Sequence, residues 1–125
     1  MKRALVIEDD ENNMKLITFI LEKNGYDIIR AETGQKGIDM VLREKPDFIL
    51  LHIQLPDMDG TEVLKKIRQS DINGGVPVIA VTSYAMSGDR ERLLQAGCSG
   101  YIEKPIDPET IISEIKRIIG EGGWK

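Results

Sequence analysis

Short apolar runs alternate with amphipathic segments along the whole chain, and this alternation is the feature that most restricts its fold. It is typical of successive βα units that wrap around a parallel sheet. We predict five strands, over residues 4–7, 27–31, 48–51, 76–81 and 100–102. The first, third and fourth are continuously apolar, as central strands covered on both faces should be. The second contains polar residues and the fifth is short, so both are expected at the sheet edges.

Five helices are expected where apolar residues recur at helical spacing. The first follows Asn12 and Asn13, which are suited to capping a helix start, and it ends at Gly25. The last is expected over residues 108–119, with Asp107 as its cap and Pro108 at its first position. The other three are predicted over residues 35–43, 61–69 and 87–95.

Length and composition indicate one domain with a packed core. The chain has 125 residues, of which 41% are hydrophobic and 30% charged, and such values are typical of a globular domain. The single cysteine, Cys98, has no partner for an internal disulfide, which favours the reducing cytoplasm. No stretch resembles a signal peptide or a membrane span, and the net charge of −4 offers no basic surface. We therefore expect no membrane or nucleic-acid partner, a monomer or weak dimer, a domain over residues 1–120 and a flexible tail over residues 121–125.

Polar side chains follow four of the predicted strands at the point where each strand ends. In an open parallel sheet, ligands bind outside the carboxyl ends of the strands. One polar residue at a strand end is common, whereas several together indicate a site. These residues are Glu8, Asp9 and Asp10 after the first strand, His52 after the third, Thr82 and Ser83 after the fourth, and Glu103 and Lys104, which precede Pro105, after the fifth.

The chemistry of these side chains suits a phosphate and a divalent cation. Adjacent carboxylates at Glu8 and Asp9 repel each other unless a cation lies between them, so they look like half of a metal site. Mg²⁺ prefers a few carboxylate or carbonyl oxygens together with water and phosphate oxygens. A hydroxyl at Thr82 and an ammonium group at Lys104 are suited to neutralising phosphoryl oxygens.

These residues and their spacing resemble the response-regulator receiver family, the CheY-like domains, over nearly the whole chain. The stretches that carry the resemblance are residues 6–10, 46–60, 77–82 and 100–105. The run over residues 82–86 and the lack of an output domain look most like stand-alone receivers of the DivK type, or receivers attached to hybrid kinases. The resemblance implies an α/β fold: a flavodoxin-like, doubly wound sheet of five parallel strands in the order 2-1-3-4-5, with helices on both faces.

The resemblance also implies a magnesium site. Glu8, Asp9 and the residue at position 52 would hold Mg²⁺, with the backbone carbonyl of Gln54 as a further ligand. In this chain position 52 is His52, where the family has the aspartate that accepts a phosphoryl group. We therefore expect Mg²⁺ binding to be weakened, and Zn²⁺ or Ni²⁺ to be possible alternatives, because imidazole suits softer ions.

The switch residues of the family have counterparts in this chain. The resemblance implies that Thr82 is the hydroxyl that follows the phosphoryl group, that Lys104 is its counter-charge, and that Tyr101 is the aromatic residue whose rotamer reports activation. The peptide bond between Lys104 and Pro105 matches one that family members commonly hold in cis. Gly60 matches a loop position that permits a tight backbone approach.

Histidine at position 52 leaves three interpretations open. As a structural residue, His52 would donate to Glu8 or Asp9 and take the place of the cation, leaving a folded domain that is not phosphorylated. Together with the same two carboxylates it would bind a transition metal such as Zn²⁺, Ni²⁺ or Cu²⁺. Alternatively, His52 itself or Asp9 accepts the phosphoryl group. The carboxylates are expected to raise the pKa of His52, with Lys104 partly cancelling them.

We predict a non-enzymatic signalling module of a two-component phosphorelay. It would dock on a histidine kinase or phosphotransferase protein, with normal aspartyl phosphorylation at position 52 lost or altered. The resemblance implies that partners bind the fourth helix, fifth strand and fifth helix. The alternatives are a metal-binding pseudo-receiver, a small metal-dependent phosphatase that uses Asp9, and an electron carrier related to flavodoxin. The phosphatase is disfavoured because 125 residues leave no room for a cap domain that excludes water.

Overall fold

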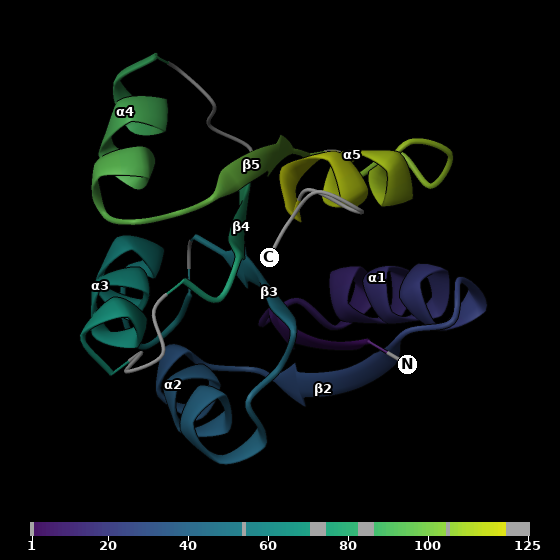
Figure 1. Ribbon diagram of the computed structural model, residues 1–125, viewed down its shortest axis with the longest axis horizontal. Helices are drawn as coiled ribbons and strands as arrows, with labels where there is room; N and C mark the ends of the chain where they lie inside the picture. Colours follow the sequence, from purple (N-terminus) through teal and green to yellow (C-terminus); the bar gives the residue numbers. More distant parts are fainter. Residues whose placement is uncertain (1, 54, 71–74, 83–86, 105, 120–125) are drawn as a thin grey trace.

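A five-stranded parallel sheet forms the centre of the computed structural model, which describes residues 2–53, 55–70, 75–82, 87–104 and 106–119 (Figure 1). Its strand order is β2-β1-β3-β4-β5, which confirms the predicted order and the edge positions of the polar second strand and the short fifth strand. The strands are β1 (Arg3–Ile7), β2 (Asp27–Ala31), β3 (Phe48–His52), β4 (Val78–Thr82) and β5 (Gly100–Glu103).

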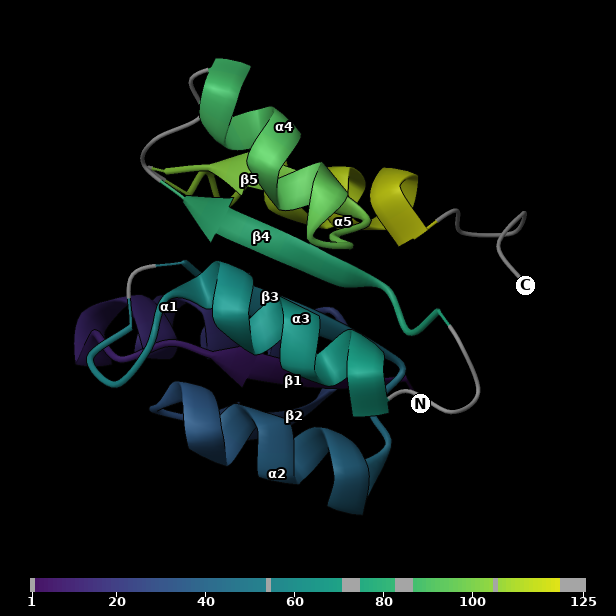
Figure 2. The same cartoon turned by 90° about the vertical axis from the view of Figure 1, so that its left-hand side faces the viewer.

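Helices cover both faces of this sheet. Figure 2 shows α2, α3 and α4 in front of the sheet, while α1 and α5 lie behind it. The helices are α1 (Glu11–Lys23), α2 (Gly34–Glu44), α3 (Gly60–Ser70), α4 (Ser87–Gln95) and α5 (Ile111–Ile119). Successive residues of one strand serve opposite cores: Ala4 and Val6 pack with α1 and α5, whereas Leu5 and Ile7 pack on the other side. This two-sided burial explains why the central strands are continuously apolar.

The α2 and α3 helices each begin one residue earlier than predicted, and α1 and α5 differ more from their predicted starts. The cap of α1 is Asp10, whose side chain accepts a hydrogen bond from the backbone N–H of Asn12 at 3.0 Å. The prediction of a cap at Asn12 or Asn13 was therefore wrong. The α5 helix begins at Ile111, because Asp107 first closes a separate turn by accepting a hydrogen bond from the Glu109 N–H at 2.9 Å.

Backbone chemistry explains where α1 ends and where β4 begins. The α1 helix ends just before Gly25, as predicted, and this glycine has a φ of 90° in the region that side chains rarely adopt. The β4 strand begins at Val78, two residues later than predicted. Pro77 has no N–H to donate, although its carbonyl accepts a hydrogen bond from the Ile49 N–H at 2.9 Å.

No helix among the described residues is long and apolar enough to cross a membrane, and the predicted tail over residues 121–125 lies outside them.

The loop between β3 and α3 closes tightly on itself at Gly60. The Gly60 N–H donates to the carbonyl of Ile53 at 2.6 Å. A Cβ atom on Gly60 would lie 2.6 Å from Ile53 Cα and 2.8 Å from Ile53 O, both of them backbone atoms. The predicted close approach is thus confirmed, and it holds the start of α3 against the residue that follows His52.

We expect Gly60→Ala to lower the free energy of unfolding by roughly 1–3 kcal/mol, because the backbone of Ile53 must shift to admit the methyl group. Urea unfolding followed by circular dichroism measures this loss. Gly34→Ala is a suitable comparison, since its new Cβ would meet the side chains of Met58 and Val63, at 2.7 Å in each case, rather than backbone. A smaller loss is expected there, and a Gly60→Ala protein as stable as the parent would contradict this account of the loop.

Candidate functional site

The carboxyl ends of four strands bring the predicted polar residues to one edge of the sheet. Glu8 and Asp9 follow β1, His52 is the last residue of β3, Thr82 is the last of β4, and Lys104 follows β5. This convergence results from the parallel register, which pairs Ile7 with Leu51, His52 with Val81, and Thr82 with Glu103. The sheet therefore places groups that lie far apart in sequence within reach of one another.

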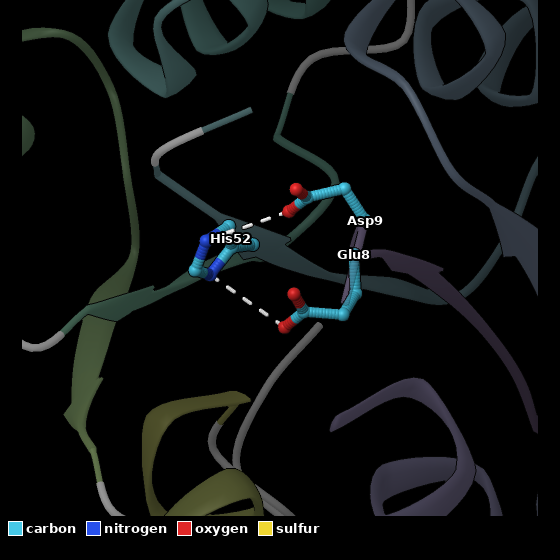
Figure 3. A group of neighbouring side chains, drawn as sticks. All are labelled: Glu8, Asp9 and His52. Atoms are coloured by element: carbon cyan, nitrogen blue, oxygen red, sulfur yellow. Dashed lines mark ion pairs between the residues drawn. The ribbon is translucent and has the colours of Figure 1, made fainter. Parts of the chain in front are cut away.

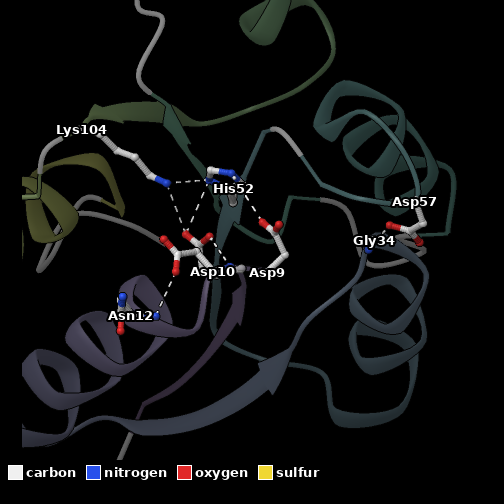
Figure 4. A network of polar contacts seen from close by, with 8 residues as sticks. Asp9, Asp10, Asn12, Gly34, His52, Asp57 and Lys104 are labelled. Carbon is white, nitrogen blue, oxygen red and sulfur yellow. Dashed lines mark hydrogen bonds and ion pairs between the residues drawn. The ribbon is translucent and has the colours of Figure 1, made fainter.

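The His52 ring lies between the two carboxylates (Figure 3). Its Nδ1 is 3.5 Å from Glu8 Oε1, and its Nε2 is 3.7 Å from Asp9 Oδ1. Lys104 enters from the other side (Figure 4), and its Nζ is 2.8 Å from His52 Nδ1. An ammonium group only donates hydrogen bonds, so Nδ1 must accept here. The ring is then neutral, with its proton on Nε2 facing Asp9.

Burial lowers the pKa of His52 below its ordinary value. Removal from water is the largest cause and Lys104 adds to it, while Glu8, Asp9 and Asp10 act in the opposite direction. The prediction of a raised pKa was wrong, because only 14% of the side chain is exposed and sequence spacing does not reveal that burial. The lowered pKa agrees with the neutral ring that the Lys104 contact requires.

Glu8 has one satisfied oxygen and one that accepts no hydrogen bond. Its side chain is 1% exposed, and Oε2 accepts a hydrogen bond from the Asp10 N–H at 3.1 Å. Among the described residues, Oε1 accepts none, although His52 Nδ1 and Lys104 Nζ both lie 3.5 Å away. That distance exceeds the usual range of about 2.7–3.2 Å for such bonds. The pocket therefore holds a buried carboxylate oxygen with capacity for a further cation or donor.

The remaining predicted site residues lie around this cluster. Thr82 is buried, and its carbonyl accepts a hydrogen bond from the Lys104 N–H at 2.9 Å, which anchors the backbone from which the lysine extends. Tyr101 is half-buried and packs on the side of the sheet that carries α2, α3 and α4. Gln54 and Pro105 lie outside the described residues, so the predicted carbonyl ligand and the predicted cis peptide bond remain predictions.

Asp57 is a residue whose role the sequence reasoning missed. Its Oδ1 accepts a hydrogen bond from the Gly34 N–H at 2.8 Å, and its Oδ2 accepts one from the Gln35 N–H at 3.0 Å. The side chain thus caps the start of α2 from the loop that follows His52 (Figure 4). These backbone hydrogen bonds lower the pKa of Asp57. The contact spans 23 residues of sequence, so no local capping pattern points to it.

The Asp57 contact predicts a pH-dependent contribution to stability. Because its pKa is lowered in the folded protein, the stabilisation is present above the unfolded pKa of about 3.9 and is lost as the pH falls through the folded value. We expect Asp57→Asn to be less stable than the parent at neutral pH, with a difference that shrinks in acid. Urea unfolding across this pH range measures it, with the exposed Asp27→Asn as a control of equal charge change. A difference that does not change with pH would contradict the charged cap.

NMR titration of His52 tests the balance of charges in the pocket directly, because the chain has a single histidine. We expect a pKa below about 6.5 in the parent. Lys104→Met should raise it by removing a neighbouring cation, and Glu8→Gln should lower it further by removing an anion. A pKa above the ordinary value in the parent would show that the carboxylates outweigh burial.

Comparison with known proteins defines the class to which this fold and site belong. The chain matches the response regulator receiver domain family over residues 4–116 and belongs to that family. It is 43% identical to the polar-differentiation response regulator DivK of Brucella anthropi over 120 residues, which are 96% of this chain and 98% of that protein.

Solved structures show the same relationship. A CheY-like receiver domain protein from Methanospirillum hungatei is 35% identical with a TM-score of 0.88, covering 97% of this chain and 95% of its own. The receiver domain of a sensor histidine kinase from Pseudomonas aeruginosa is 32% identical with a TM-score of 0.86, covering 96% of this chain and 98% of its own. That structure has a magnesium ion coordinated in its active-site cleft.

These relationships confirm the predicted family and the predicted resemblance to DivK-type proteins. The chain is a receiver domain of two-component signalling, and receivers of this class interact with kinases or phosphotransferases. Receiver domains bind Mg²⁺ in an acidic active site. In this chain the described residues match Mg²⁺ poorly, because an imidazole stands beside Glu8 and Asp9, and the Lys104 ammonium group already lies among these donors.

Proposed function

We propose that this chain is a cytoplasmic receiver module that docks on a histidine kinase or phosphotransferase protein without being phosphorylated at residue 52. The observation that carries the proposal is the contact of 2.8 Å between Lys104 Nζ and His52 Nδ1. In a phosphorylatable receiver, position 52 would offer carboxylate oxygens to the phosphoryl group. Here the side chain at that position is held in a contact with the lysine that would otherwise neutralise the transferred group.

Neither nitrogen of His52 is well placed to attack a phosphoryl group. The lone pair of Nδ1 accepts from Lys104, and the proton on Nε2 faces Asp9 across 3.7 Å. An attacking atom needs a free electron pair in line with the leaving group. These contacts favour the structural interpretation of His52 over phosphorylation of its ring. Asp9, whose side chain is 37% exposed, remains the substitute acceptor to be tested.

The rest of the phosphoryl-transfer site is retained. Thr82 ends β4 beside the pocket, and Lys104 already points into it. Phosphoryl transfer depends mainly on such positioning and on charge neutralisation. We therefore attribute the loss of phosphorylation to the nucleophile alone, and not to decay of the surrounding fold.

A docking surface is proposed on α4, β5 and α5. A hollow of about 510 Å³ lies there and is lined partly by Leu94, Tyr101 and Ile118. Leu94 is 49% exposed, and Glu103 and Arg117 add charges of both signs to the rim. A recess that combines a few apolar side chains with charged groups of both signs suits a protein partner. The residues that line this hollow do not include Glu8, Asp9, His52 or Lys104, so we expect the surface to be retained with histidine at position 52.

Treatment with acetyl phosphate distinguishes a site that lacks only its acceptor residue from a site that has lost its other phosphoryl-transfer groups as well. We expect the parent to gain no phosphoryl group in the presence of Mg²⁺, whereas His52→Asp gains one, because the shorter carboxylate restores the acceptor oxygen and releases Lys104 from the imidazole. Intact mass spectrometry of both proteins after identical treatment gives the result.

His52→Asn is the matched control, because it has the size of aspartate without a nucleophilic oxygen, and it should stay unmodified. A phosphoryl group on the parent would instead identify Asp9 or His52 as a working acceptor. If His52→Asp stayed unmodified, the site would have decayed beyond that residue, and the attribution of the loss to the nucleophile alone would be wrong.

A further inference from the structure

Three residues in the pocket offer donor atoms close enough to surround one small metal ion, and two of these atoms already have the separation that such an ion requires. Glu8, Asp9 and His52 each offer a ligand atom, and these atoms lie within 4.8 Å of one another. The Glu8 Oε1 and His52 Nδ1 atoms are 3.5 Å apart. A tetrahedral ion with bonds of about 2.0–2.2 Å places its donors about 3.3–3.6 Å apart. The first two donors therefore match such an ion as they stand, and the partly exposed Asp9 can rotate to complete the set.

A second observation points to a missing cation at the same place. Glu8 Oε1 is buried and accepts no hydrogen bond from any described residue, yet it faces His52 and Lys104. A buried carboxylate oxygen left without a hydrogen bond costs at least about 1–3 kcal/mol. The nearest compensation is the ammonium group at 3.5 Å. Direct bonding to a cation would satisfy this oxygen more completely.

The chemistry of the donors selects the type of ion. Mg²⁺ favours six oxygen ligands in a strict octahedron and loses its water reluctantly. An imidazole nitrogen with two carboxylates instead suits Co²⁺, Ni²⁺, Cu²⁺ and Zn²⁺. We propose that Glu8, Asp9 and His52 form a site for a divalent transition-metal ion, and that Lys104 competes with this ion for the same electron pairs. This inference goes beyond the proposed docking function, because it assigns a ligand to the pocket. Metal binding can also be measured separately from phosphorylation.

Lys104 is the internal competitor because it contacts the two donors that the ion would bind. Its Nζ lies 2.8 Å from His52 Nδ1 and 3.5 Å from Glu8 Oε1. The Nδ1 lone pair cannot serve an ammonium proton and a metal ion at the same time. Metal entry must therefore displace the lysine, whose long side chain has the rotamers to move away. The measured metal affinity is then lower than the affinity of the pocket without the lysine contact, because the ion binds only the fraction of molecules in which Lys104 has moved away.

Calorimetric titration of the metal-free parent with Ni²⁺, Co²⁺ and Mg²⁺ tests the site. We expect Ni²⁺ and Co²⁺ to bind at least about tenfold more tightly than Mg²⁺. Bound Co²⁺ should show a visible absorption band, and bound ion should alter the NMR signals of the single histidine. His52→Asn should remove this preference while the protein stays folded by circular dichroism. Equal or tighter binding of Mg²⁺, or a Ni²⁺ affinity unchanged in His52→Asn, would overturn the site.

Two lysine variants test the competition. Lys104→Met should increase Ni²⁺ affinity by about five- to tenfold, because it removes the group that occupies the donors. Lys36→Met changes the net charge equally from the exposed surface of α2 and should have little effect. If both variants changed the Ni²⁺ affinity equally, Lys104 would act only through its charge at a distance. That result would overturn the proposal that Lys104 competes with the ion for its ligands. None of these outcomes alters the acetyl phosphate experiment, so failure of the metal site and failure of the proposed function remain distinguishable.

Discussion

The parallel pairing of β1, β3 and β4 is the constraint on which the rest of the structure depends. It buries the continuously apolar strands between two helical layers, and the same pairing delivers the polar strand ends to one edge. The packing of the hydrophobic core beneath them thus holds the carboxylates, the imidazole and the ammonium group close together. Their positions do not depend on attraction between their charges. The core also removes them from water, which changes their acid–base behaviour.

Burial decides the state of His52 in this pocket. Two carboxylates near an imidazole would by themselves favour the imidazolium form, and in an exposed cluster that effect would dominate. Here the cost of burying a second cation beside Lys104 is larger. A neutral ring that accepts from the ammonium group is the result, with the Glu8 carboxylate balancing the charge of the lysine. The three groups form a compact arrangement with one buried oxygen incompletely satisfied.

Local patterns and family resemblance predicted the sheet order, the edge strands and the tight approach at Gly60 correctly. What they could not supply depends on contacts between distant segments. Asp57 caps α2 across 23 residues of sequence, and the sign of the pKa shift at His52 follows from burial that only the packed fold creates. The predicted start of α5 was also wrong, because Asp107 and Pro108 suit a separate turn as well as a helix.

The residue at position 52 also decides what Lys104 does. Beside an aspartate, an ammonium group neutralises a carboxylate or an incoming phosphoryl group, so it promotes the charge that the site must hold. Beside an imidazole, the same group occupies the only lone pair available on the neutral ring, so it blocks the atom that would act as nucleophile or ligand. One substitution thus reverses the contribution of a second residue without moving it. The retained Lys104 and Thr82 are therefore insufficient grounds for assigning phosphorylation to a receiver, because their effect depends on whether the central side chain presents oxygen or nitrogen to them.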